Sequence, residues 1–353
     1  MRKLDELIAN AARLAAEQPG KGEALDWNGG ALAGAIAEWH SVQLARPGQR
    51  LLIDVPAAAL RSCPELAASA PAWLVQTGGA PDGATELPEG WQVSRRLPSD
   101  LFTLEEALLA WLPNAGSMLA VQQVLLQRQG GEAWIGSGAL RQVMAPFLLN
   151  TTGESQLPLV LAECARVLET GGSFETLVLA ADEPLSGAEI PCEGHLCRHF
   201  PKEDEIADLL LRAGFHGVTL TPVLDRPAVI TDGAELRAFA LSAHTGTRGV
   251  CLEQGDAAVY LGPWSRVEDD DGHVYPRGVR IAVCAKTAAV LQRPPYAGSF
   301  AIIPAYGRPP LEDAALFDCS QTAVRPVAET KGRAPLGSSG RLAAECRDGD
   351  CGC

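Results

Sequence analysis

The sequence lacks an excess of positive charge, and this excludes a general nucleic-acid-binding protein. Lys and Arg together number 29 against 43 Asp and Glu, which gives a formal net charge of −14 over 353 residues. A chain this acidic has no electrostatic footprint for a phosphate backbone or an anionic lipid surface. We therefore expect neither nucleic acid nor membrane among its partners.

Long apolar runs and dense cysteine are missing as well. No stretch approaches the roughly 18 uninterrupted apolar residues of a membrane-spanning helix, and the amphipathic segment 1–16 has no unbroken apolar centre like that of a signal peptide. The 10 cysteines are about 3% of the chain, which is below the density of a disulfide scaffold. We expect a cytoplasmic protein whose thiols are either buried small residues or ligands for a soft ion.

Alternating strand and helix patterns predict an α/β protein. Apolar, β-rich segments predict strands at 50–55, 71–79 and, less clearly, 90–97. Further along, the pattern predicts a helix over 157–170, a strand over 173–180, a helix over 202–215 and a strand over 217–224. This succession is typical of a mostly parallel sheet with helices between its strands.

The residue pattern and composition of the sequence change near residue 235 and again after Pro304. Two predicted strands, followed by a strand that runs into a helix, indicate a smaller α+β domain over 235–305. Beyond it the chain is rich in Pro, Gly and Ser with little periodicity. We expect a first domain over 1–234, this smaller domain, and a flexible cysteine-containing tail over 306–353.

Three stretches in the second half carry specific motifs, in order and at sensible spacing. Residues 191–215 join a cysteine to a helix that ends in AGF, and residues 235–264 join a strand to a second cysteine and Y-L-G. Residues 269–300 hold an acidic-His segment, VC-x-x-T and a closing aromatic-x-x-x-Phe. Together they resemble the arsenite S-adenosylmethionine methyltransferase family. The resemblance implies a class I methyltransferase-like, Rossmann-like first domain, S-adenosylmethionine as cofactor, and As(III) or As(III)–thiol conjugates as substrate.

The resemblance also implies a set of thiol ligands. Cys192 matches the family's first arsenic-binding cysteine and Cys251 the second, while Cys63 falls where the family's nucleotide loop ends in a cysteine. Trivalent arsenic is soft, pyramidal and carries a lone pair, so three deprotonated thiols can hold it with the lone pair directed at an electrophilic methyl group. Catalysis would then consist mainly of positioning the two reactants.

The cofactor side departs from the family pattern. The loop from Asp54 to Cys63 contains no glycine, and Pro56 removes a backbone N–H, although close approach of a cofactor needs a glycine-rich turn. Gln76 stands where an acid would hold the ribose, and Asn150 is what remains of the family's asparagine-containing segment. The candidate cofactor-binding residues are therefore Asp54, Gln76 and Asn150, in a divergent member with an eroded loop.

Two functions from different classes follow. The first is an arsenite methyltransferase. The second is a catalytically inactive relative that binds a metalloid or soft metal through thiols, alone or as the partner of an active paralogue. A structural pseudoenzyme without a metalloid role is a third alternative.

The C-terminal CRDGDCGC adds three thiols on a flexible segment, at Cys346, Cys351 and Cys353. These could capture As(III) or a d10 metal such as Zn(II) or Cu(I), or they could belong to an inert disordered end.

Other chemistry-bearing residues have plainer explanations. We expect Cys164 and Cys284 in the core, because each lies in an apolar stretch, whereas Cys197 could replace the third ligand. His195 and His199 are four residues apart, so a helix would place both on one face, where they could bind zinc. The neighbouring Gly194 and Pro201 make a helix there unfavourable, and with it the zinc site. The acidic run 268–271 predicts a solvated turn.

Overall fold

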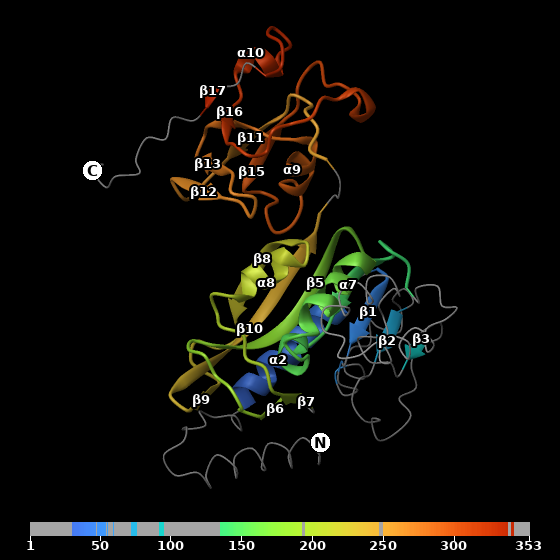
Figure 1. The fold of residues 1–353 in the computed structure, drawn as a ribbon, viewed down its shortest axis with the longest axis vertical. Helices are drawn as coiled ribbons and strands as arrows, with labels where there is room; N and C mark the ends of the chain where they lie inside the picture. Colours follow the sequence, from blue (N-terminus) through green and yellow to red (C-terminus); the bar gives the residue numbers. More distant parts are fainter. Residues whose placement is uncertain are drawn as a thin grey trace, which may run out of the picture. The chain divides into compact units, whose positions relative to one another are not determined.

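The computed structural model describes residues 30–46, 48–53, 55, 59, 72–75, 92–94, 135–192, 195–246, 250–337 and 340–341. The chain divides into two compact units, Met1–Thr245 and Gly246–Cys353, and each is described by itself (Figure 1). Within the ranges just given, no helix has both the length and the apolar character needed to cross a membrane.

The first unit is built on an 8-stranded sheet with the order β3-β2-β1-β4-β5-β10-β8, and β9 pairs with β10. The strands are β1 (Arg50–Ile53), β2 (Ala72–Val75), β3 (Gln92–Ser94), β4 (Leu140–Met144), β5 (Leu168–Ala181), β8 (Phe215–Pro222), β9 (Val229–Thr231) and β10 (Ala234–Thr245). A separate hairpin is formed by β6 (Ile190–Cys192) and β7 (His195–Cys197). The helices are α2 (Gly30–Leu44), α6 (Leu148–Thr151), α7 (Leu157–Val167) and α8 (Ile206–Arg212).

The sheet is mostly parallel and doubly wound. β1 pairs in parallel with β2 on one side and with β4 on the other, so the chain reverses its direction of winding between these two neighbours. β10 runs antiparallel to both β5 and β8. This strand order confirms the predicted α/β class, and in such sheets ligands bind at the carboxyl ends of the strands near the reversal point.

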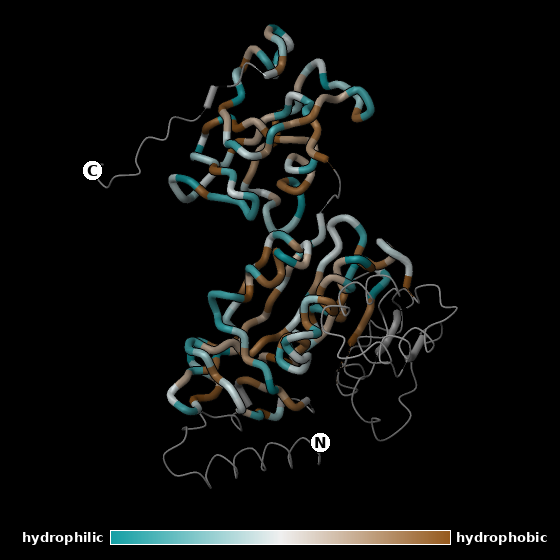
Figure 2. The backbone as a smooth tube through the Cα atoms, in the orientation of Figure 1, coloured by the Kyte–Doolittle hydropathy of each residue, from teal (hydrophilic) through white to brown (hydrophobic). Residues whose placement is uncertain are grey.

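Alternation along the strands separates two apolar layers. Leu51 and Ile53 of β1 pack with helices α7 and α8 on one face of the sheet, whereas Leu52 packs with α2 on the other. The burial of successive residues on opposite faces follows from the two-residue period of a strand. Both faces are covered, so the central strands are apolar along most of their length, as Figure 2 shows.

The helix α7 ends earlier than its apolar pattern predicts. Leu168 already has extended backbone, so Gly171 and Gly172 lie inside β5 and do not stop the helix. The β4–β5 register shifts between Leu140 and Gln142. A Cβ at Gly172 would lie 2.9 Å from the carbonyl oxygen of Glu169, so glycine is required there by close backbone approach.

The division between the units falls at residues 245 and 246, not at the expected 234 and 235. The segment 235–243, expected to open the smaller domain, belongs to β10, which is hydrogen-bonded between β5 and β8. Nine consecutive residue pairs tie β10 to β5, from Leu236–Ala181 to His244–Ser173. This ladder fixes the strand in the first sheet.

The second unit has a 5-stranded sheet with the order β15-β11-β14-β16-β17 and a separate hairpin β12-β13. Its elements are β11 (Ala257–Tyr260), β12 (Arg266–Glu268), β13 (Val274–Pro276), β14 (Arg280–Ala282), α9 (Ala285–Val290), β15 (Phe300–Ile303), the 3-10 turn η4 (Leu311–Asp313), β16 (Ala323–Val324), α10 (Val327–Thr330) and β17 (Gly340–Arg341). Its core gathers Ala258, Tyr260, Tyr275, Ile281, Val283, Ala288 and Leu291.

Residues 306–337 differ from the expected flexible tail. They supply β16 and α10, and Arg325 between them is 1% exposed. The sequence has little apolar periodicity here because the segment is joined to the unit by ion pairs and backbone hydrogen bonds more than by an apolar face.

Stability of the first unit should depend on pH through His244. This side chain is 9% exposed, and burial, with smaller effects of His216 and Arg46, lowers its pKa to about 4 from a usual value near 6.5. The unfolded chain therefore binds more protons between these values, so the contribution of His244 is fully present above about pH 6.5 and is lost as pH falls towards 4. Urea unfolding between pH 7 and 5 should show a smaller loss of unfolding free energy in His244→Gln than in the wild type. Equal losses would contradict this assignment.

Candidate functional site

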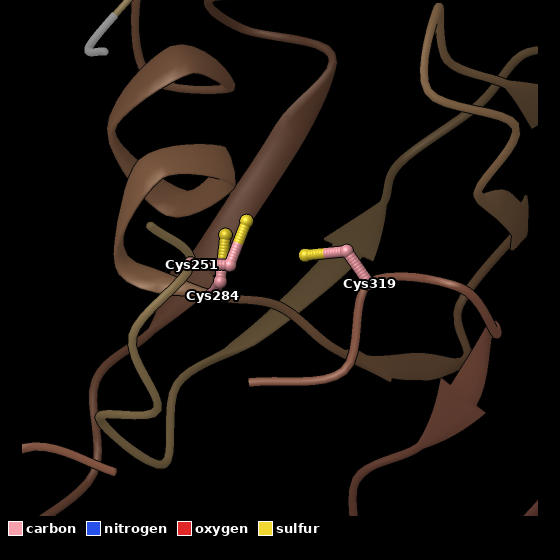
Figure 3. Close-up of side chains that lie close together, drawn as sticks. All are labelled: Cys251, Cys284 and Cys319. Atoms are coloured by element: carbon pink, nitrogen blue, oxygen red, sulfur yellow. The ribbon is translucent and has the colours of Figure 1, made fainter. Parts of the chain in front are cut away.

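Three cysteines of the second unit come together although they are far apart in the sequence. The sulfur atoms of Cys251, Cys284 and Cys319 all lie within 4.8 Å of one another. Cys251 and Cys284 lie side by side, and Cys319 points towards them from the opposite side (Figure 3). Cys284 is buried, whereas the other two are partly exposed, so an ion could reach this thiol cluster from solvent.

Cys284 is held at the first turn of α9. Its backbone is extended, and its sulfur accepts a hydrogen bond from the Thr287 backbone N–H at 3.4 Å, as an N-cap side chain does. The Thr287 hydroxyl lies 3.2 Å from the same sulfur and can also donate to it. The motif C-x-x-T thus fixes the direction of the thiol.

Two of the thiols, Cys284 and Cys319, differ in acidity. Burial opposes ionisation of Cys284, but hydrogen bonds from the Thr287 hydroxyl and backbone N–H, and from Cys319 and Cys251, outweigh it and lower its pKa below the usual value. Burial, together with hydrogen bonding to Cys251 and the charge of Cys284, raises the pKa of Cys319. Ionisation within the cluster is therefore favoured at Cys284 over Cys319.

Backbone hydrogen bonds align Cys251 with both partners. The Ala285 N–H donates to the Leu252 carbonyl oxygen at 2.9 Å, which sets Cys251 beside Cys284. The Phe317 N–H donates to the carbonyl oxygen of Cys251 at 2.8 Å, which brings the segment before Cys319 to the same place. The cluster thus follows from the path of the main chain.

A buried ion-pair network joins the chain segments next to Cys251 and Cys284. The Arg325 guanidinium donates to both carboxylate oxygens of Glu253 at 2.8 Å and to Glu329 at 2.6 Å. Its backbone N–H also donates to Arg280 of β14, four residues before Cys284. One buried cation therefore ties together the chain segments that carry Cys251 and Cys284.

The segment that carries Cys319 is tied to the β12-β13 hairpin. His273 Nε2 lies 3.0 Å from the carbonyl oxygen of Cys319, and Nδ1 lies 3.0 Å from Asp269 Oδ2. Because both partners are acceptors only, both ring nitrogens carry a proton. Hydrogen bonding to Asp269 accordingly raises the pKa of His273, and Tyr275 donates to the same carboxylate at 2.8 Å. Asp269 is thus a structural anchor and not the solvated turn residue that was expected.

The structure brings Cys251 together with Cys284 and Cys319. It leaves the predicted grouping of Cys251 with Cys192 and Cys63 untested. Cys192 ends strand β6 in the first unit, and its side chain lies outside the described residues, as does Cys63. The tail cysteines Cys346, Cys351 and Cys353 are outside them as well. Their roles as ligands therefore stay predictions.

Two cysteines of the first unit are buried in its apolar core, and one histidine contacts the main chain. Cys164 is 2% exposed on the apolar side of α7, as expected, and Cys197 is fully buried in the apolar cluster beneath α2. His199 Nδ1 lies 2.9 Å from the carbonyl oxygen of Leu149. Among the described residues, the only group of three or more potential metal ligands is the thiol cluster of the second unit.

Little of the predicted cofactor site falls within the described residues. Asp54 and Gln76 are outside them. Asn150 is fully buried; its amide donates to the carbonyl oxygens of Leu179 and His199 at 2.8 Å, and its Oδ1 accepts from the Leu179 N–H at 2.9 Å. Asn150 therefore joins α6 to β5 and to His199, and its role towards a cofactor stays a prediction.

The two described residues of the loop after β1 are apolar. Val55 is 2% exposed, and Ala59 packs against the same cluster. Neither offers a side-chain polar atom to a cofactor. The chemistry that the described residues can perform lies in the thiol cluster.

Sequence reasoning missed two of the three clustered thiols as candidate ligands. Cys284 was assigned to the core, and it is indeed 1% exposed, but burial and ligation are compatible for a thiol at a helix N-terminus. Its VC-x-x-T motif was the available signal. Cys319 stands in a Pro- and Gly-rich segment with no motif around it, and long-range hydrogen bonds such as those of Phe317 and His273 bring it to the others.

Comparisons with known proteins concern the fold and the second unit. Residues 247–335 match the model of a domain of unknown function (DUF8838), and no curated protein matches the sequence. A 1,6-didemethyltoxoflavin-N1-methyltransferase from Burkholderia thailandensis, solved with S-adenosylhomocysteine, is 16% identical with a TM-score of 0.38, over 69% of this chain and 89% of its own. An arsenic(III) S-adenosylmethionine methyltransferase from Chlamydomonas reinhardtii is 14% identical with a TM-score of 0.36, over 82% and 99%.

Likenesses this remote carry no argument about substrate or site. The class I methyltransferase-like α/β fold of the first unit rests on its own strand order, with β10 antiparallel beside β5. The family match covers only the second unit, the part that contains the thiol cluster.

Removing the buried cation should destabilise the second unit. Arg325→Met leaves Glu253 and Glu329 without their shared partner, and breaking one side of a buried ion pair typically costs about 3–5 kcal/mol. Arg277→Met, which removes an exposed side chain bonded only to the Pro263 carbonyl oxygen at 2.9 Å, should cost less than about 1 kcal/mol. Denaturant unfolding of both variants checks this. A loss from Arg325→Met no larger than that of the control would contradict the role given to this network.

Proposed function

We propose that this protein binds trivalent arsenic, as arsenite or an As(III)–thiol conjugate, through cysteine thiolates. The observation that carries the proposal is the convergence of Cys251, Cys284 and Cys319 within 4.8 Å. The resemblance of the second half to arsenite methyltransferases supports the same substrate. Such a protein must keep its thiols reduced, which suits the cytoplasm.

The binding reaction is a condensation without net oxidation. Arsenous acid reacts with three thiols to give three As–S bonds, and each displaced hydroxide leaves as water with a thiol proton. Cys284 is suited to attack first, because hydrogen bonds to its sulfur lower its pKa below the usual value. Cys251 and Cys319 displace the second and third hydroxides, and the proton that each of the three thiols gives up, directly or through solvent, leaves in the water formed.

The number of ligands favours a three-coordinate ion over zinc. Structural zinc is almost always bound by four protein ligands, whereas the cluster among the described residues offers three sulfurs and no His, Asp or Glu. Pyramidal As(III) is satisfied by three soft donors. Antimony(III) would fit the same set.

Methyl transfer from S-adenosylmethionine is a second candidate function. The doubly wound sheet of the first unit favours it, because its order reverses between β2 and β4 around β1. The glycine-free loop 54–63 weighs against it. A binding protein that acts alone or with an active paralogue is the alternative.

Arsenite binding should depend on each clustered thiol. We expect reduced full-length protein to retain one arsenic per chain in equilibrium dialysis with elemental mass detection. Cys251→Ser, Cys284→Ser and Cys319→Ser should each weaken binding by more than the 10–100-fold typical of losing a partner outside the first coordination sphere. Cys164→Ala, which removes a buried cysteine of the first unit, should retain affinity.

The same assay separates the two ligand sets. Cys63→Ser and Cys192→Ser should leave the affinity unchanged if the thiol cluster is the site, and should abolish tight binding if the family's set is used instead. Absence of arsenic from wild-type protein would overturn the proposed function. Speciation after addition of glutathione and S-adenosylmethionine then reports whether methylated arsenic forms.

The missing glycines provide a test of the second candidate. If they limit cofactor binding, the triple variant Pro56→Gly/Ala58→Gly/Leu60→Gly should bind S-adenosylhomocysteine more tightly than the wild type in isothermal titration calorimetry, because backbone can then approach the ligand. Tight binding by the wild type that the variant does not improve would show that other contacts serve the cofactor, and would favour methyl transfer.

A further inference from the structure

His273 connects the thiol cluster to the rest of the second unit without contributing a ligand. It is 5% exposed, and both ring nitrogens are used: Nδ1 donates to Asp269 and Nε2 donates to the carbonyl oxygen of Cys319 at 3.0 Å. With both nitrogens so engaged, the ring has no lone pair to offer an ion. The geometry points to a role in placing Cys319.

The orientation of the ring is itself fixed. Asp269 Oδ1 accepts the His273 backbone N–H at 2.8 Å, and Oδ2 accepts the Tyr275 hydroxyl at 2.8 Å. Tyr275 is fully buried, with its ring against that of Phe300 at 5.1 Å between centroids. The carboxylate therefore cannot turn away, and the imidazole it binds cannot turn either.

The Cys319 segment is also anchored on either side. On one side, the Phe317 N–H is bonded to Cys251; on the other, the Thr322 hydroxyl accepts the Val274 N–H at 2.9 Å. Between these anchors Asp318 and Ser320 bond to each other and are exposed. Between these anchors, the bond to His273 holds the Cys319 main chain itself.

We propose that His273 is a positioning residue, which holds the Cys319 carbonyl through Nε2–H and so keeps the third thiol facing Cys251 and Cys284. This inference rests on the proposed function for its ligand, but its geometry concerns the free protein as well. Without this hydrogen bond, the segment between residues 317 and 322 would relax, and the site would retain two thiols near one another.

Two substitutions separate the two ring nitrogens. The amide nitrogen of Gln lies the same number of bonds from Cα as Nε2, so His273→Gln can still donate to the Cys319 carbonyl. The amide nitrogen of Asn corresponds to Nδ1, so His273→Asn can still bond Asp269 but cannot reach Cys319. Each variant removes the buried ring, which makes them matched controls for one another.

The first readout is arsenite binding by the full-length reduced protein, with free thiols counted after each addition. The wild type and His273→Gln should each lose three thiols per arsenic bound. His273→Asn should lose two and bind about 10–100-fold more weakly, as expected for loss of a partner behind a ligand. Equal affinity and three thiols consumed in His273→Asn would overturn the proposal.

The second readout needs no arsenic. Alkylation by iodoacetamide, followed by peptide mass spectrometry, should modify Cys319 faster in His273→Asn than in the wild type or His273→Gln, with Cys251 unchanged. Unchanged Cys319 alkylation would overturn the proposed role of His273.

If the wild type binds no arsenite, the proposed function fails, while this readout still decides the role of His273. If His273→Asn does not fold, His273→Gln decides: three thiols consumed and slow Cys319 alkylation support the proposal, and two-thiol binding or fast alkylation overturns it.

Discussion

The buried guanidinium of Arg325 is the constraint on which the second unit depends. It is paired with Glu253, two residues after Cys251, and with Glu329 of α10, while its backbone bonds to β14 just before Cys284. An isolated buried charge is very costly, so the two carboxylates must stay with it. Glu253 is two residues from Cys251, and the Arg325 backbone N–H bonds to Arg280, four residues before Cys284, so Arg325 joins the chain segments of both cysteines.

The thiol cluster is thereby assembled from three kinds of local structure. Cys284 is oriented by the cap of α9, Cys251 by hydrogen bonds of an extended segment, and Cys319 by the carbonyl that His273 binds. The difference in acidity follows from the same contacts, since hydrogen-bond donors gather around the sulfur of Cys284. Three converging sulfurs, with ionisation favoured at Cys284, suit the exchange of three hydroxides of a trivalent metalloid for sulfur.

The sequence predicted the part of the molecule that periodicity governs. The α/β class followed from segments such as 50–55 and 217–224, and the family resemblance predicted Cys251 as a candidate thiol ligand. The assignment of 235–243 to the smaller domain was wrong because an antiparallel β10 returns to the first sheet, which no local pattern reveals. The partners Cys284 and Cys319 were missed as ligands because long-range backbone bonds bring them together, and residues 306–337 have polar ties such as those of Arg325 in place of an apolar stripe.

The central claim is that three sulfurs of the second unit hold one As(III). Arsenic K-edge X-ray absorption of the reduced full-length protein with one equivalent of arsenite measures this directly, because it counts the atoms bonded to arsenic. The account predicts three sulfur neighbours and no oxygen in the wild type and in Cys63→Ser/Cys192→Ser, and mixed sulfur and oxygen neighbours in Cys319→Ser. Three sulfur neighbours that persist in Cys319→Ser, or oxygen neighbours in the wild type, would contradict it.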